Sequence, residues 1–363
     1  FELSGGMAQR AALGLALLNS PKVIFADEPT SALDASTQVQ VAEELVSANR
    51  EFGASLLVVS HNIALASYMA EYLYERRGSG GGRPFPPHSV EPAAPVYPFA
   101  YQLDSAAWGC SMKVLEVEGV SKSFPGMGKQ ALSGVSFCLQ QGECLGIVGG
   151  SGSGKTTLAH IIMLLQRPDS GSVSLFGQEI LGLSGKQRKR VYAQMQMVFQ
   201  MPLESFDPSY SLGASIAEVG RSFGASRTEA KQRALEKLDS VGLDESFYRR
   251  FPTEASGGQC QRAALARALM AEPSVLVCDE ITSALDVTSQ AHIVSLIKQL
   301  KGKVSLLFIT HDLALASGLA DRLLVLDNGR VAESGRTEEV LANPQSACAQ
   351  ELVRSFRFLD GGR

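Results

Sequence analysis

The sequence lacks an apolar run of the roughly 18 residues that a membrane-spanning helix needs. It has no charged segment followed by an apolar one of the kind that forms a secretory signal peptide, and its six cysteines include no CxxC pair. We therefore expect reduced cysteines in the cytosol, and a membrane role only through a partner. Blocks of Lys and Arg are short and the net charge is −4, so nucleic acid is not an expected partner.

What the sequence does contain is ample apolar material and an internal repeat. With 45% apolar residues, a chain of 363 residues can form two or three packed domains. Residues 3–40, beginning LSGGMAQR, return as residues 255–292, beginning ASGGQCQR, and the later VVSHNIALAS returns as FITHDLALAS. The match then ends, because nothing after Tyr74 corresponds to LLVLDNGRVAESG at 323–335. We predict that the first copy is incomplete at both ends.

The repeat and the composition together define three segments. Glycine and proline crowd residues 78–98, which removes backbone donors and raises unfolded-state entropy, so we expect a linker or a disordered segment there. From Met112, placed as an initiator methionine would be, strand-like runs alternate with amphipathic helices. This alternation predicts an α/β fold with a mostly parallel sheet flanked by helices, while residues 203–255 read as helical. The predicted segments are residues 1–74, a linker at 75–111 and an intact unit at 112–363.

A glycine-rich segment, GGSGSGKTT, lies between the apolar strand CLGIV and a helix, which is the context of a phosphate-binding loop. Its glycines let successive backbone N–H groups point at a polyphosphate, and the helix start adds positive potential. We expect Lys155 to reach the β- and γ-phosphates and Thr156 to bind Mg²⁺. A merely flexible turn would not require Gly-Lys-Thr at this junction. The candidate nucleotide-binding residues are Gly149, Gly150, Ser151, Gly152, Ser153, Gly154, Lys155, Thr156 and Thr157.

An acidic pair follows the apolar strand in VLVCDE. Two carboxylates at the end of a buried strand are costly unless a cation and a proton transfer use them. Asp279 suits Mg²⁺ and its water, and Glu280 suits the base that orients an attacking water. Such a pair alone is as often a helix N-cap, but the phosphate loop in the same unit favours the catalytic interpretation.

Three further side chains are candidates that also have a structural interpretation. His311 ends the strand LLFIT and can donate to a γ-phosphate, although a histidine at a strand end usually has a structural role. Phe124 can stack on adenine or simply cover the core. Gln200, in MVFQMP, carries little information by itself.

Taken together and in this order, the motifs resemble those of ATP-binding cassette (ABC) ATPases over nearly all of residues 112–363. The resemblance implies a P-loop NTPase fold with a helical signature subdomain and an antiparallel β subdomain, with ATP and Mg²⁺ as cofactors. It assigns catalysis to Glu280, His311 and Gln200, and metal binding to Thr156, Gln200 and Asp279. Ile281 stands where the family often has proline, which leaves both carboxylates in place. The signature residues are Ser256, Gly257, Gly258 and Gln259, the D-loop aspartate is Asp286, and Phe124 is the adenine-stacking candidate.

The first copy resembles the C-terminal half of a second cassette that has lost its phosphate loop. Its signature is Ser4, Gly5 and Gly6, followed by VIFADE, the D-loop Asp34 and His61. Cassettes of this family pair head to tail, so that ATP lies between one cassette's phosphate loop and the other's signature. The resemblance therefore implies a second cassette as partner, either the first copy of the same chain or an intact cassette of another.

Within the family, an SGGM copy followed by an SGGQ cassette resembles the paired ATPase subunits of dipeptide, oligopeptide and nickel importers. This resemblance implies permease subunits and a periplasmic or lipid-anchored substrate-binding protein as partners, at the cytoplasmic face of a bacterial inner membrane. Two alternatives stay open: a non-transport ABC ATPase, and a decayed or misfused product with a frameshifted stretch near residues 75–100. The cargo is not encoded in this chain.

Overall fold

The structure, a computed structural model, describes residues 5–18, 21–30, 33, 35–52, 55–60, 62–70, 73–74, 84–85, 112–124, 130–283 and 285–359. The chain divides into two compact units, one of Phe1–Gln102 with Gln350–Arg363 and the other of Leu103–Ala349. The segment boundaries expected at 74/75 and 111/112 stay a prediction. In the part of the chain that the structure describes, no helix combines the length and apolarity that crossing a membrane requires.

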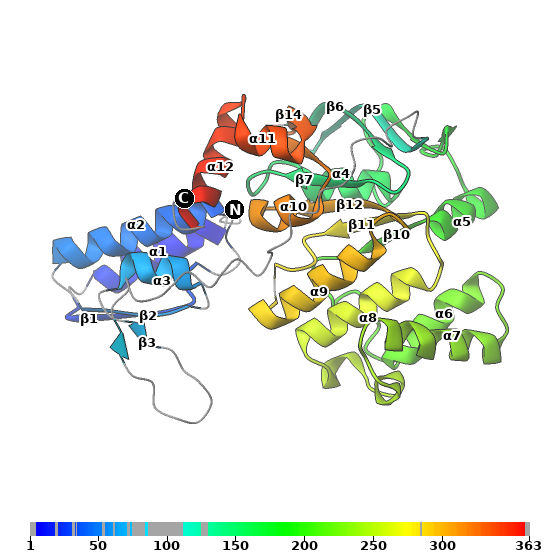
Figure 1. The fold of residues 1–363 in the computed structure, drawn as a ribbon, viewed down its shortest axis with the longest axis horizontal. Helices are drawn as coiled ribbons and strands as arrows, with labels where there is room; N and C mark the ends of the chain where they lie inside the picture. Colours follow the sequence, from blue (N-terminus) through cyan, green and yellow to red (C-terminus); the bar gives the residue numbers. More distant parts are fainter. Residues whose placement is uncertain are drawn as a thin grey trace. The chain divides into compact units, whose positions relative to one another are not determined.

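The larger unit is built on a six-stranded sheet in the order β10-β11-β12-β7-β13-β14 (Figure 1). All neighbours in this sheet are parallel except the last pair, β13 and β14, so the predicted mostly parallel sheet is confirmed. Its central strands are apolar runs buried along their whole length, as expected for a parallel sheet covered on both faces. The strands are β10 (Met195–Val198), β11 (Val275–Asp279), β12 (Ser305–Thr310), β7 (Cys144–Val148), β13 (Arg322–Asp327) and β14 (Arg330–Arg336).

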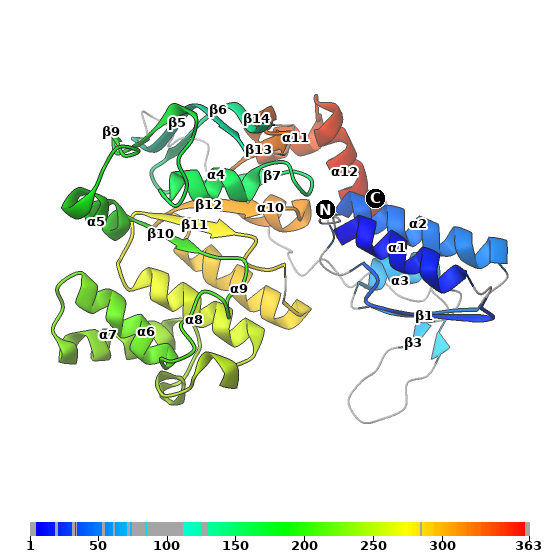
Figure 2. The same cartoon turned by 180° about the vertical axis from the view of Figure 1, so that it is seen from behind.

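A second, antiparallel sheet in the order β6-β5-β8-β9 covers one side of this unit (Figure 2). Its inward side chains, such as Val117 and Leu132, share one apolar core with Leu158 and Ile161 of α4 (Lys155–Ile162). The predicted antiparallel β subdomain is therefore present. Its strands are β6 (Gln130–Gln140), β5 (Lys113–Ser123), β8 (Ser170–Leu175) and β9 (Gln178–Glu179).

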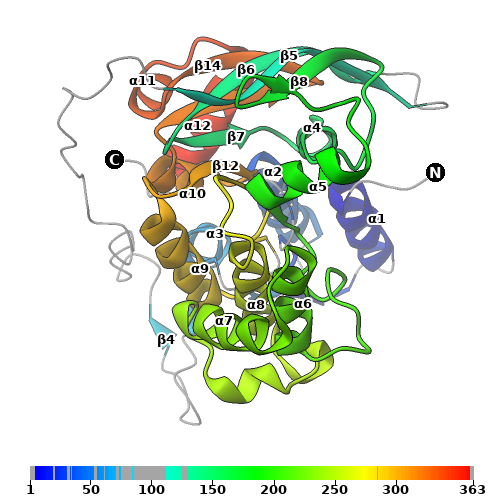
Figure 3. The ribbon, with the colours of Figure 1, turned by 90° about the vertical axis from the view of Figure 1, so that its right-hand side faces the viewer.

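Residues 203–255 contain helices and no strand, as predicted, and every residue of this range is described. Figure 3 shows α6, α7 and α8 grouped beside the parallel sheet rather than within its layers. The helices of this group are α6 (Leu212–Ser222), α7 (Arg227–Ser240), α8 (Gly257–Leu269) and the 3-10 turns Glu245–Tyr248 and Pro252–Glu254. The remaining helices from residue 112 onward are α5 (Gly185–Gln194), α9 (Val287–Leu300), α10 (Leu313–Leu319), α11 (Thr337–Ala342) and α12 (Ala347–Leu359).

The smaller unit pairs two parallel strands, β1 (Val23–Asp27) and β2 (Ser55–Val59), and adds helices to them. Within the predicted linker, Pro84–Phe85 forms a two-residue strand, β4, that pairs with β3 (Leu73–Tyr74). Proline is tolerated in β4 because both strands of a two-stranded sheet are edge strands, and one side of each makes no ladder hydrogen bonds. The helices are α1 (Gly5–Leu17), α2 (Ala35–Phe52) and α3 (Ile63–Met69).

One face of the β1–β2 sheet carries exposed apolar side chains. Val23, Phe25, Leu57 and Val59 are between 45% and 62% exposed. The sequence repeat and the matching strand pairing place them at the positions of Val275, Val277, Leu307 and Ile309, which are all fully buried in the core of the larger unit. In the described part of the smaller unit, β1 and β2 thus leave exposed the apolar side chains whose counterparts are buried in the larger unit.

Candidate active site

The predicted phosphate loop lies between the buried strand β7 and helix α4. At two positions of the loop, Gly149 and Gly154, any larger side chain would collide with the main chain. A Cβ at Gly149 would lie 2.2 Å from the Leu326 carbonyl oxygen. Gly154 has φ +103°, and a Cβ there would lie 2.5 Å from the Ala131 carbonyl oxygen. The loop can therefore follow this path only with glycine at both positions.

Lys155, the first residue of α4, is 5% exposed and folds back over the loop. Its Nζ donates hydrogen bonds of 2.9 Å to the carbonyl oxygens of Gly149 and Gly150. The same nitrogen lies 3.9 Å from Oε1 of Glu280. The loop thus holds a buried cation at the start of a helix, where positive potential favours an anion such as a phosphate.

The predicted acidic pair stands at the end of β11. Glu280 follows the strand with φ +46°, and its N–H donates to the Ile309 carbonyl of β12 at 2.9 Å. A left-handed backbone is uncommon for a residue other than glycine and costs conformational energy, which the bond to β12 helps to offset. Glu28 repeats this geometry in the smaller unit, with φ +46° and an N–H bond of 2.8 Å to the Val59 carbonyl.

Asp279 is 2% exposed, and burial, followed by the nearby charge of Glu280, raises its pKa to about 6. The Thr156 hydroxyl, which hydrogen-bonds to Asp279, and the charge of Lys155 oppose this rise. Oδ1 of Asp279 has no hydrogen-bond partner among the described residues. A buried carboxylate oxygen beside a hydroxyl fits the oxygen ligands that Mg²⁺ prefers. Within the described ranges there is no group of three His, Cys, Asp or Glu that could hold a metal.

Two separate segments bring polar side chains to Oε2 of the Glu280 carboxylate. Gln200, which follows β10, donates from Nε2 to Oε2 of Glu280 at 3.0 Å. His311, which follows β12, places Nδ1 3.4 Å from the same oxygen. The three predicted catalytic residues therefore lie together. Ser283, which was not among the predicted site residues, also belongs here: its Oγ donates to the Glu280 carbonyl at 2.9 Å and lies 3.4 Å from Gln200 Nε2.

The predicted signature begins helix α8 and is not part of the cluster around Glu280. Ser256 caps α8 by accepting from the Gln259 N–H at 3.3 Å, and the Gln259 side chain accepts from the Ser256 N–H at 2.9 Å. A Cβ at Gly258 would lie 2.3 Å from Oγ of Ser289 in α9, so glycine is needed there for helix packing as well. Asp286 caps α9 through the Ser289 N–H, and that bond is the main reason why its pKa is lowered.

Of the remaining predicted residues, those that the structure describes are not brought to the cluster around Glu280. Phe124 follows β5, and the Lys122 Nζ lies 5.9 Å from its ring centroid, so adenine stacking by Phe124 stays a prediction. Gly5 and Gly6 begin α1. Ser4, Asp34 and His61 lie outside the described residues.

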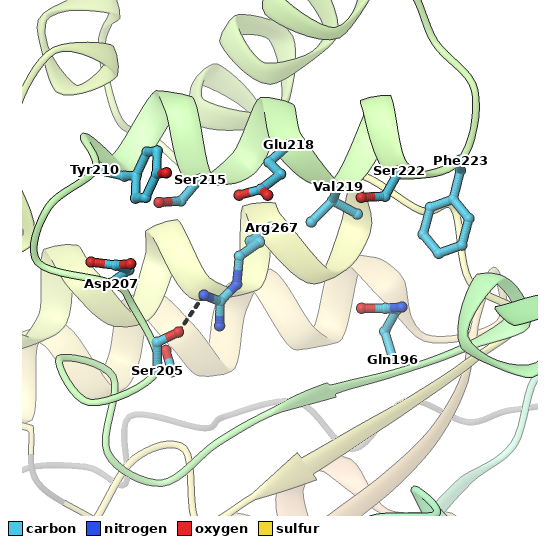
Figure 4. Close-up of a pocket in the computed structure, with 10 residues that line it drawn as sticks. All are labelled: Gln196, Ser205, Asp207, Tyr210, Ser215, Glu218, Val219, Ser222, Phe223 and Arg267. Atoms are coloured by element: carbon cyan, nitrogen blue, oxygen red, sulfur yellow. Dashed lines mark hydrogen bonds between the residues drawn. The ribbon is translucent and has the colours of Figure 1, made fainter. Parts of the chain in front are cut away.

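A cavity of about 630 Å³ lies beyond Gln200, next to α6 and α8 (Figure 4). The side chain of Arg267 points into it from α8 and donates to the Ser205 carbonyl. The resemblance to importer ATPases implies that the region after Gln200 takes up a short helix of the permease, which stays a prediction. The lining of the cavity comes from four separated segments. The lining residues are Gln196, Ser205, Asp207, Tyr210, Ser215, Glu218, Val219, Ser222, Phe223 and Arg267.

Comparisons with known proteins agree with this geometry. Residues 1–31 and 132–283 match the family described as ABC transporter. The oligopeptide transport ATP-binding protein OppD of Mycobacterium tuberculosis is 31% identical, in an alignment that covers 100% of this chain and 75% of that protein. The peptidoglycan transport ATP-binding protein YejF of Agrobacterium fabrum is 35% identical, over 97% of this chain and 68% of the relative.

Two further similarities cover the larger part of the chain. The oligopeptide transport ATP-binding protein OppF of Escherichia coli is 43% identical over 235 residues, or 64% of this chain and 70% of that protein. Among solved structures, the dimeric structure of a post-hydrolysis state of an ATP-binding cassette bound to ADP and Pi matches with a TM-score of 0.57. It is 29% identical, and the match covers 61% of this chain and 98% of the other.

Proposed function

The chain belongs to the ABC transporter family of ATP-binding cassettes, which hydrolyse ATP, and from this premise we propose that it powers an importer for peptides or related compounds. The observation that carries the proposal is the convergence of Lys155, Gln200 and His311 on the Glu280 carboxylate. Residues 112–363 are then the complete cassette, and residues 1–74 are the C-terminal half of another.

We assign the nucleotide to the loop at 149–157. Its backbone N–H groups and Lys155 hold the phosphates, and Thr156 with Asp279 holds Mg²⁺, with Gln200 close by. The bound metal supplies positive charge that offsets the charge of the phosphates. Glu280 orients the attacking water and accepts its proton, while Gln200 and His311 fix the carboxylate and contact the γ-phosphate.

Two cassettes complete the site. The signature at Ser256 begins a helix whose free N–H groups suit the γ-phosphate of a nucleotide bound to the facing cassette. The dimeric arrangement of the similar solved cassette supports pairing. We favour two intact cassettes over pairing of the two copies within one chain, because the smaller unit has an uncovered apolar face.

The cavity beside α6 is our candidate contact for the permease. It adjoins the turn after Gln200, so a short helix of the membrane partner seated there would act close to the catalytic cluster. Peptides are the proposed cargo class because the relatives' names include oligopeptide and peptidoglycan transport, and the nickel alternative has less support. A substrate-binding protein and the cytoplasmic face of the inner membrane complete the proposed setting.

The test is ATP hydrolysis and nucleotide binding by the full chain, wild type against Lys155→Ala. We expect the substitution to weaken Mg-ATP binding by about a hundredfold or more, because a charge-assisted contact to the phosphates is lost. Lys237→Ala, which removes an ordinary surface lysine from α7, is the matched control and should bind like the wild type. Equal binding by all three proteins would rule out the proposed phosphate site.

A further inference from the structure

Two side chains of helix α8 hold the turn that leads from strand β10 to the cavity. Gln261 donates from Nε2 to the Phe199 carbonyl at 3.2 Å. Arg267, further along the same helix, donates to the Ser205 carbonyl (Figure 4). Gln200, which contacts Glu280, lies directly after the first of these carbonyls. Helix α8 therefore fixes both ends of a turn that contains a catalytic candidate.

At a buried position that needed only packing, a glutamine such as Gln261 would be less favourable than an apolar side chain. It is 1% exposed, and its Oε1 has no hydrogen-bond partner within the described part of the chain. An unsatisfied buried amide oxygen carries a desolvation cost that an apolar side chain of similar size would avoid. The repeat nevertheless has glutamine in both copies, Gln9 in LSGGMAQR and Gln261 in ASGGQCQR, although the two residues before it differ. A specific use of the donor explains both observations.

The donor acts on the peptide group that precedes Gln200. The planar peptide from Phe199 to Gln200 turns as a unit, so holding the Phe199 carbonyl sets the direction in which the Gln200 side chain leaves the backbone. That side chain reaches Glu280 with a bond of 3.0 Å. Because misplacement of a catalytic group by about 1 Å can lower a rate about a hundredfold, loss of this anchor should affect turnover.

The bond from Arg267 to the Ser205 carbonyl fixes the end of the turn that lies away from Phe199. The Arg267 guanidinium stacks over the Phe206 ring at 4.3 Å and is largely buried, which lowers its pKa. Between the two anchors, the turn is held by bonds of its own, including Ser205 Oγ to the Pro202 carbonyl at 2.8 Å. The turn is thus a short, braced segment, and its orientation depends on its two attachments to α8.

We propose that Gln261 is a positioning residue for ATP hydrolysis, which holds Gln200 in contact with Glu280 through the Phe199 carbonyl. The inference rests on the proposed ATPase function. It assigns Gln261 no contact with nucleotide, so nucleotide affinity should not depend on it.

The experiment compares Gln261→Met, which keeps the length and removes the donor, with Arg262→Met in the full-length chain. Arg262 is the matched control because it also bonds from α8 to main-chain carbonyls, those of Val241 and Gly242, at the end of α7. We expect Gln261→Met to lower kcat about tenfold or more with KM for ATP within about twofold. Arg262→Met should leave kcat near the wild-type value, although it lowers stability.

Hydrogen exchange supplies a readout that needs no activity. In Gln261→Met, the backbone amides of residues 200–205, apart from Pro202, should exchange faster than in the wild type, while those in the middle of α8 keep their protection. In Gln261→Glu, a protonated carboxyl can again donate to the Phe199 carbonyl, so its kcat relative to wild type should rise as pH falls from about 8 to 6. Gln261→Met should show no such recovery.

Each outcome decides the matter. Unchanged exchange at 200–205 in Gln261→Met overturns the inference, whatever the ATPase assay shows. Equal losses of kcat in Gln261→Met and Arg262→Met reduce Gln261 to a structural residue. A wild-type chain that binds no ATP would refute the proposed function instead, and the exchange experiment would still report on the anchor.

Discussion

The side-chain amide of Gln200 donates a hydrogen bond of 3.0 Å to Oε2 of Glu280, across 80 positions of the sequence. The contact exists because β10 and β11 are parallel neighbours, so that the residues following them leave the sheet at the same edge. His311 Nδ1 lies 3.4 Å from the same oxygen, and Ser283 Oγ lies 3.4 Å from Gln200 Nε2. A base held by several partners keeps one orientation, which is what activation of a water molecule requires.

The first prediction concerns Glu280→Gln. The substitution keeps the shape of the side chain and removes its ability to accept a proton, so turnover should fall about 10²- to 10⁴-fold while nucleotide affinity stays within about threefold. Steady-state phosphate release and equilibrium nucleotide binding measure the two effects. Turnover equal to wild type would exclude Glu280 as the base.

Much of the site could be predicted because its motifs are contiguous. A strand, a glycine-rich loop and a helix follow one another at 144–162, and the acidic pair directly ends an apolar strand, so local order alone places Lys155 and Asp279. The alternation of strands and helices likewise predicts a mostly parallel sheet. The order β10-β11-β12-β7-β13-β14 could not be predicted in this way, since it depends on pairing between strands far apart in the chain.

The contacts that were missed are those between distant segments. Nothing in the sequence near Gln261 or Ser283 indicates that one bonds to Phe199 and the other to Glu280. One signal was available, because the repeat has glutamine at positions 9 and 261 beside residues that vary. The repeat also predicts uncovered apolar surface in the smaller unit, because residues 1–74 of the sequence contain no counterpart of the phosphate-loop segment at 144–162.

The second prediction separates two adjacent glycines of the phosphate loop. Gly149→Ala places a Cβ 2.2 Å from the Leu326 carbonyl oxygen and should lower the free energy of unfolding by about 1–3 kcal/mol, with loss of nucleotide binding. Gly150→Ala is the matched control, because a Cβ there meets nothing within 4 Å. It should change stability by no more than about 0.5 kcal/mol. Chemical denaturation measures both, and similar losses for the two variants would contradict the loop geometry.

The third prediction follows from the raised pKa of Asp279, which is about 6. Below that pH the carboxyl keeps its proton in the folded protein, and Mg²⁺ must displace the proton to bind. The contribution of Mg²⁺ to nucleotide affinity should therefore be complete well above pH 6 and fall about tenfold for each pH unit below it.

The measurement is nucleotide binding with Mg²⁺ and with EDTA between about pH 4.5 and 8. Asp279→Asn is the control, because the phosphates of the nucleotide also take up protons in this range and the variant reports on that effect alone. The difference between Mg²⁺ and EDTA should be smaller in the variant, and should change with pH only through protonation of the nucleotide phosphates. A Mg²⁺ effect in the wild type that does not change with pH would show that Asp279 is not a ligand.

The fourth prediction uses the repeat as an internal control. Phe25 and Val277 occupy matching positions in β1 and β11, but Phe25 is 62% exposed and Val277 is fully buried. Phe25→Lys should leave protease resistance unchanged and reduce the binding of a hydrophobic dye, since it removes apolar surface from solvent. Val277→Lys buries an unpaired charge and should destabilise the larger unit by about 4 kcal/mol or more. A large loss of stability in Phe25→Lys would mean that this face is packed.

The last prediction distinguishes two ways of completing the ATP site. If two intact cassettes pair, the signature at Ser256 faces a phosphate loop of the partner chain, and Ser256→Arg should abolish hydrolysis by placing a bulky cation where the phosphate is bound. If the site forms within one chain, Ser4→Arg should abolish it instead. We expect Ser256→Arg to be inactive and Ser4→Arg to retain activity, because the apolar face of the smaller unit argues against a complete second cassette.

The comparison needs a control for the lost helix cap, since Ser256 also caps α8. Ser226 provides one: it caps α7 with the same capping box, accepting from the Glu229 N–H at 3.3 Å while the Glu229 side chain accepts from its N–H at 2.9 Å. Ser256→Arg and the control Ser226→Arg should each lower the free energy of unfolding by about 1 kcal/mol through loss of the helix cap. Only Ser256→Arg should stop turnover. Loss of hydrolysis in Ser4→Arg together with normal hydrolysis in Ser256→Arg would reverse the assignment, because the working signature would then be that of the first copy.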